Sequence, residues 1–96
     1  MPLTGKQRRQ LRALGHHLDP VVLVGQSGVT EGLIAAVVQA LHDHELIKVK
    51  INEGPEDRHE AAEKLAQGTG AELAQLIGRT VLLFKKRDED SKFDKL

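Results

Sequence analysis

The strongest candidate for a binding site is a pair of glycines, Gly25 and Gly28, that follow the apolar run 21–24. The loop carries no side-chain base or nucleophile, so it indicates binding and not catalysis. Glycines three positions apart allow a sharp turn and the close approach of another backbone. Thr30 and Glu31 come next and are typical of a helix N-terminus, where unpaired N–H groups and the helix dipole favour an anion. We therefore predict a strand, a tight loop and a helix start that can hold a phosphate. The alternative is an ordinary turn, since Gly-x-x-Gly alone is a weak motif.

Other side chains do not form a catalytic or metal-binding pattern. The chain has five histidines and no cysteine, and no two histidines are four residues apart, the spacing that places two ligands on one helical face. Ser27 lacks the Gly-x-Ser-x-Gly elbow of a serine nucleophile. Acidic pairs around residues 56–63 are explained by solvation and by the helix dipole. We therefore expect no catalytic residues, no metal and no cofactor.

Length and composition indicate one small domain. Of the 96 residues, 40% are hydrophobic and 29% charged, as in ordinary globular proteins. We predict a domain over residues 1–87 and a disordered charged tail over 88–96. The sequence shows neither a span of about 20 apolar residues nor the apolar core of a signal peptide. We therefore expect a cytoplasmic location and no membrane partner.

The first helix is predicted to begin at the cap residue Thr4 and to end before Pro20. One stripe of this helix is predicted to pack inward: Gln7, Leu11, Leu14 and Leu18. Its basic residues should face outward: Lys6, Arg8, Arg9 and Arg12.

Three later segments alternate between strand and helix. The run 21–24 is apolar on both faces, so we predict a strand inside a sheet. A helix capped by Thr30 should run to about residue 44. Residues 46–51 then alternate, with isoleucine and valine on one face and Lys48 and Lys50 on the other. This strand–helix–strand order predicts a parallel pair.

The last segments predict a helix over 56–67 after a turn at 52–55, and then a hairpin. Strands over 72–77 and 80–86 flank Gly78 and Arg79, a spacing typical of a tight hairpin. The order is helix, strand, helix, strand, helix, strand, strand. We therefore predict an α/β (α+β two-layer) fold, with one four-stranded mixed sheet and helices mainly on one face.

Charge is neutral overall but segregated along the chain. Residues 1–30 carry four bases and one acid, and residues 73–87 carry four bases and no acid. If these bases share one side with the glycine loop, they form a phosphate-binding surface. The chain has two phenylalanines and no tyrosine or tryptophan, so it lacks platforms for stacking single-stranded bases. This favours recognition of the backbone and shape of structured RNA.

Five blocks of sequence resemble the bacterial YhbY family, the single-domain form of the CRM (chloroplast RNA splicing and ribosome maturation) domain. The similarity covers about residues 2–87. The blocks read LTGKQ at 3–7, ALGHHL at 13–18, GQSGVT at 25–30, HELIKVK at 44–50 and QLIGRTVLLFK at 75–85.

The resemblance implies a fold similar to the C-terminal domain of translation initiation factor three. It also implies RNA binding through the loop and the bases near it, and association of single-domain members with precursors of the large ribosomal subunit. Many members have a basic residue inside the loop, where this chain has Gln26 and Ser27.

Our leading hypothesis is a non-enzymatic, monomeric RNA-binding protein that acts on ribosomal RNA or a pre-large-subunit particle, with no small-molecule substrate. The residues assigned to RNA are Gly25, Gln26, Ser27, Gly28, Val29, Lys6, Arg8, Arg9, Arg12, Lys48, Lys50 and Arg79. Within the loop, the amides of residues 27–29 are assigned to phosphate. Two alternatives stay open: an adaptor that docks on ribosomal proteins or another assembly factor, and a small enzyme acting on a nucleotide or a phosphate ester.

Overall fold

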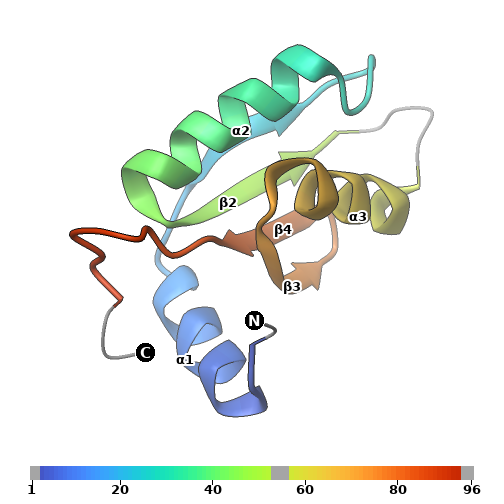
Figure 1. Cartoon of the computed structure of the whole chain (residues 1–96). Helices are drawn as coiled ribbons and strands as arrows, with labels where there is room; N and C mark the ends of the chain where they lie inside the picture. Colours follow the sequence, from blue (N-terminus) through green and yellow to red (C-terminus); the bar gives the residue numbers. More distant parts are fainter. Residues whose placement is uncertain (1–2, 53–56, 94–96) are drawn as a thin grey trace.

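The structure, a computed structural model, describes residues 3–52 and 57–93 and has the predicted element order (Figure 1). The elements are α1 (Gly5–Gly15), β1 (Pro20–Val24), α2 (Glu31–His44), β2 (Leu46–Ile51), α3 (Arg58–Thr69), β3 (Glu72–Ile77) and β4 (Thr80–Phe84). The strands form one mixed sheet in the order β1-β2-β4-β3, in which only β1 and β2 are parallel. The predicted fold class is confirmed. Part of the predicted turn at 52–55 lies outside the described residues.

The sheet carries helices on both faces. Helices α2 and α3 cover one face, where Val37 and Leu65 belong to the same buried cluster as Val49 and Leu83. Helix α1 lies on the opposite face, hereafter the α1 side of the sheet (Figure 1). There, Leu11 packs with the buried residues Leu46, Ala74, Leu82 and Phe84. Two helices thus share a face as predicted, and α1 adds a partial third layer.

The predicted inward stripe of α1 is wrong for two of its leucines. Leu11 is completely buried, but the exposed fractions of Leu14 and Leu18 are 53% and 37%. The helix ends at Gly15, where an added Cβ would lie 2.7 Å from the Leu82 side chain. Because α1 contacts the sheet over a short length, Leu14 stays exposed and Leu18 lies beyond the helix.

Strand β1 is an edge strand, which corrects the prediction that it lies inside the sheet. Among the strands of residues 3–52 and 57–93, it pairs only with β2. Val24 is buried on the α2 side, whereas Val21 and Leu23 are each 53% exposed. Uniformly apolar strands usually lie inside sheets, but here α1 does not cover the outer strand.

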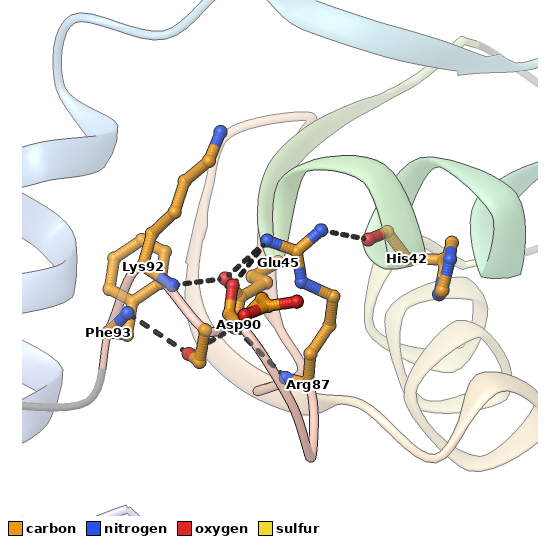
Figure 2. Close-up of polar contacts among 7 residues, drawn as sticks. His42, Glu45, Arg87, Asp90, Lys92 and Phe93 are labelled. Carbon is orange, nitrogen blue, oxygen red and sulfur yellow. Dashed lines mark hydrogen bonds and ion pairs between the residues drawn. The ribbon is translucent and has the colours of Figure 1, made fainter.

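The tail was predicted to be disordered from Asp88, but residues 88–93 dock on the domain. The anchor is Glu45, which follows α2 and is completely buried. Figure 2 shows its polar contacts with the tail. Its carboxylate accepts hydrogen bonds from the Arg87 amide (2.9 Å), the Lys92 amide (2.7 Å) and the Ser91 hydroxyl (2.5 Å). The Arg87 guanidinium lies 3.4 Å away. A buried carboxylate needs such partners, and they come from the tail.

Docking also brings Phe93 against the sheet. Its ring meets the ring of Phe84 edge to face, with centroids 5.1 Å apart, a favourable geometry for aromatic pairs. The tail therefore extends the core that α1 covers.

The surroundings of Glu45 predict a stability that depends on pH. Burial alone raises its pKa. The hydrogen bonds from Ser91, Arg87 and Lys92, with the Arg87 charge, outweigh burial and hold the pKa below its ordinary value of 4.5. The unfolded state therefore takes up this proton at a higher pH than the folded state.

The stability that Glu45 contributes should be complete above about pH 5.5 and should be lost as the pH falls through 4.5 and then through the lower folded pKa. Urea unfolding from pH 7 to pH 3 measures this. The difference in unfolding free energy between wild type and Glu45→Gln should shrink as the pH falls. A difference that is constant with pH would contradict the low pKa.

Candidate nucleic-acid interface

The two loop glycines have different structural roles. The Gly28 amide donates to the Gly25 carbonyl at 3.0 Å, which closes a four-residue turn. Gly28 is buried and has φ of +73°, a conformation that favours glycine. Gly25 is exposed, has no positive φ, and an added Cβ there would meet nothing within 4 Å. The fold therefore requires glycine at position 28 but not at position 25.

One of the predicted phosphate contacts, the Gly28 amide, is wrong. The Gly28 amide is used inside the turn, so it is not available to a ligand. For the amides of Ser27 and Val29, no partner occurs within the described part of the chain. Gln26 and Ser27 are exposed at the tip. The amides that can meet a phosphate are therefore those beside Gly28.

Helix α2 begins directly after the turn, as predicted. The Thr30 hydroxyl accepts from the Leu33 amide at 3.1 Å and caps the helix. The partial positive charge of the helix N-terminus then lies beside the loop. Glu31 occupies the first turn, so its carboxylate opposes an anion bound there, and nearby cations must outweigh it.

Two predicted cations lie at the same end of the sheet as the loop. Lys50 is paired with Leu23, two residues before Gly25. Arg79 is in the β3–β4 turn, and its carbonyl accepts from the Ile51 amide at 2.7 Å. We call the turn 25–29 together with Lys50 and Arg79 the loop-end cluster. This cluster presents two cations, Lys50 and Arg79. It also presents the amides of Ser27 and Val29, which have no partner among the described residues.

Lys48 and the bases of α1 lie farther from the loop, but on one side of the sheet. Lys48 and Lys50 alternate with the buried Val49 and so project on the α1 side. The four α1 bases are exposed: Lys6, Arg8, Arg9 and Arg12. Figure 1 shows α1 under one end of the sheet and the β1–α2 loop at the other. The cations therefore do not all meet at the loop, but they can line one path from the loop to α1.

Arg58 was missed by the sequence prediction. It begins α3, and its guanidinium donates to the Gly78 carbonyl at 3.2 Å, beside Arg79. This contact joins residues 20 positions apart. The surrounding sequence is acidic, so no local pattern marks Arg58 as a neighbour of the loop-end cluster.

Two features, metal-ligand clusters and membrane-spanning helices, are absent from the described part of the chain. Across residues 3–52 and 57–93, no three His, Asp or Glu side chains are grouped as metal ligands. None of the helices in these ranges is long and apolar enough to cross a bilayer.

Comparison with known proteins points to a single family. The family model of the CRS1 / YhbY (CRM) domain matches residues 3–85. The chain is 41% identical to "Probable RNA-binding protein YqeI" of Bacillus subtilis, covering 96% of this chain and 97% of the relative. It is 40% identical to "Probable RNA-binding protein PA4753" of Pseudomonas aeruginosa, covering 96% and 89%. The solution structure of SAV1595 from Staphylococcus aureus is similar, with a TM-score of 0.79, 38% identity, and 93% and 94% coverage.

Proposed function

This chain belongs to the CRS1 / YhbY (CRM) domain family, and from that premise we propose that it binds structured RNA through the loop-end cluster. In this proposal the amides of Ser27 and Val29 contact a phosphate, and Lys50 and Arg79 neutralise its neighbours. The RNA then continues over Lys48 toward the α1 bases. Relatives named as RNA-binding proteins support the RNA class.

The observation that carries the proposal is that position 25 holds a glycine that the fold does not require. The fold places no steric or conformational demand for glycine there, although the residue lies at an exposed turn before a helix N-terminus. Gly5 is equally open but lies on α1, away from the turn. Beside the amides of the turn and the cations Lys50 and Arg79, a glycine that the fold does not need is explained by a ligand whose backbone passes close.

A substitution at Gly25 should therefore separate folding from binding. We expect Gly25→Leu to leave the unfolding free energy unchanged or slightly raised, because the larger residue restricts the unfolded chain. RNA affinity should fall about 10- to 100-fold, the value of one charge-assisted hydrogen bond of roughly 1.5–3 kcal/mol. Filter binding with a ribosomal RNA hairpin measures this.

Gly5→Leu is the matched control, because Gly5 is also open to solvent and lies on α1. It should bind a short hairpin as wild type does. Wild-type affinity in Gly25→Leu would remove the loop from the interface.

Gln26 lies at the tip of the loop, and its replacement by glutamate or lysine changes the charge there with little change in side-chain size. We expect Gln26→Glu to weaken RNA binding about tenfold and Gln26→Lys to strengthen it, since a unit charge near 5 Å from a phosphate is worth about 1–3 kcal/mol at surface dielectrics. Gln67→Glu, an identical change on exposed α3, is the control and should have no effect. Equal effects of Gln26→Glu and Gln67→Glu would show that net charge alone is responsible.

We further propose that the RNA is ribosomal and that the chain assists assembly of the large subunit in the cytoplasm, as a monomer and by binding rather than catalysis. The family resemblance and the shortage of aromatic platforms support this class of RNA. Gradient fractionation of a lysate, with detection of the protein in each ribosomal particle, tests it. Co-sedimentation with large-subunit precursors is expected, and exclusive sedimentation as free protein would contradict it.

A further inference from the structure

We propose that the free edge of β1 is a docking site for an extended, acidic-apolar segment of a partner protein. The site lies beside the proposed RNA surface and shares Lys50 with it. The segment would add as a fifth strand beside β1. This goes beyond RNA binding, because it assigns a second partner to the backbone edge of β1 and the apolar surface beside it.

The first observation is the backbone of β1, which is the terminal strand of the sheet. The Asn52 amide donates to the Val24 carbonyl at 2.9 Å, so the backbone of Val24 points toward β2. Because backbone groups alternate in direction along a strand, the N–H and C=O of Leu23 point to the free edge. A free edge can pair with another strand.

The opposite edge of the sheet is better protected. Strand β3 carries Glu72 and a register irregularity between Leu73 and Gln75, and both features discourage strand addition. The β1 irregularity lies at its start, between Pro20 and Val22, and the ladder after it is regular. Between Pro20 and Val24 the strand has no charged residue. The edge most open to pairing is therefore β1.

The second observation is an apolar strip beside this edge. Four of the six exposed large hydrophobic residues of the described chain form it, and we call them the edge strip: Leu14, Leu18, Val21 and Leu23. Leu14, Leu18 and Val21 line a groove of about 640 Å³ together with Leu46 and Phe93. Contiguous apolar surface of this kind marks protein interaction sites.

Charge indicates the chemistry of the partner. Lys50 pairs with Leu23 and projects on the same side of the sheet, and Lys92 lies at the groove. Asp19 is the acid that lines this groove. The border is therefore cationic overall, which favours a segment whose apolar residues alternate with aspartate or glutamate.

RNA fits the aliphatic residues of the edge strip poorly. The edge strip is aliphatic, and the Phe93 ring is already engaged with Phe84. Stacking of bases requires free aromatic faces, and the aliphatic strip offers neither a ring nor a charge.

The probe is a phage-displayed library of random twelve-residue peptides, selected on the immobilised full-length protein. We expect enriched peptides to alternate apolar residues with two or more acids. A synthetic consensus peptide should shift the amide signals of residues 21–24 in a ¹⁵N NMR titration. Replacing its acids by amides should weaken it at least fivefold.

Two variants test the strand geometry. Leu23→Pro removes a donor that faces the free edge and not the ladder to β2, so peptide affinity should fall at least tenfold. Leu23→Thr keeps the amide and the strand propensity, and affinity should fall about threefold to fivefold. Ile77→Thr is the control, because Ile77 is 62% exposed on the opposite edge strand.

The proposal is overturned if no peptide is enriched, if basic peptides are selected, or if Leu23→Pro and Leu23→Thr bind the consensus peptide as wild type does. Sedimentation of the chain alone is the second measurement, and a dimer that Leu23→Pro abolishes would assign the edge to a second copy instead. RNA affinity, measured in parallel, should be unchanged in Leu23→Thr, so failure of the docking site is distinct from failure of RNA binding.

Discussion

Replacement of Glu45 by alanine should lower the unfolding free energy by about 3 kcal/mol. The carboxylate is completely buried and is held by the amides of Arg87 and Lys92, the Ser91 hydroxyl and the Arg87 guanidinium (Figure 2). Each buried donor left without a partner costs about 1–3 kcal/mol, more when it is charged. Removing one member of a buried ion pair costs about 3–5 kcal/mol.

The loss of unfolding free energy cannot exceed the cost of detaching the tail from the domain. If the donors of residues 87–92 lose Glu45, the tail can detach and water can satisfy them. The cost then becomes that of undocking the tail, including the loss of the Phe84–Phe93 ring contact. We therefore expect residues 88–93 to lose amide protection in hydrogen exchange in the Glu45→Ala protein.

Urea unfolding near pH 7 measures the effect, with two further chains as controls. Glu60→Ala removes an exposed acid 3.6 Å from Lys64 and should cost less than about 0.5 kcal/mol. In a chain that ends at Arg87, Glu45→Ala should cost clearly less than in the full chain, because the two changes remove one shared interaction. A loss below 0.5 kcal/mol in the full chain would show that the Glu45 contacts do not stabilise the fold.

The contact of Glu45 with the tail shows why the sequence prediction failed at the C-terminus. The tail is rich in charge and was predicted to be disordered on that basis, which is sound for a segment without a partner. Its partner lies 46 residues away from Ser91. No periodicity or local composition links Glu45 to that serine, so only the folded chain brings the two together.

Local patterns predicted the elements well where one face of an element meets the core. The alternation in β2 gave its bounds, Leu46–Ile51, and Thr30 correctly marked the start of α2. The same reasoning failed for Leu14 and for the position of β1. An apolar residue at the right spacing shows that burial is possible, but whether a neighbour covers it depends on the extent of α1 and on strand order.

For the candidate site, the sequence identified the loop and most of the cations but could not separate their roles. Gly25 and Gly28 look alike in the sequence, and only the φ of +73° at Gly28 distinguishes them. The bases were predicted as one set. Strand pairing and the packing of α1 divide them into a group at the loop end and a group on the helix.

That division predicts a large difference between two triple variants. The first variant, Lys48→Gln, Lys50→Gln, Arg79→Gln, removes both cations of the loop-end cluster and the neighbouring Lys48 of the same strand. We expect it to lower the magnitude of the slope of log affinity against log salt by about three, one for each lost phosphate contact. At 50 mM salt this corresponds to a loss of affinity of about a hundredfold or more. Filter binding of a short RNA hairpin between 50 and 200 mM salt measures both quantities.

The comparison variant is Arg8→Gln, Arg9→Gln, Arg12→Gln, which removes the same charge from α1. Leu11 of α1 packs on Leu46, and β2 spans about 17 Å from Leu46 to Ile51, next to the loop. RNA must bridge a distance of that order to contact both groups. The α1 variant should therefore bind a short hairpin almost as wild type does and lose affinity only for longer RNA. If the α1 variant loses more affinity for the short hairpin than the Lys48, Lys50, Arg79 variant, the RNA enters over α1, and the loop at Gly25 is not its primary contact.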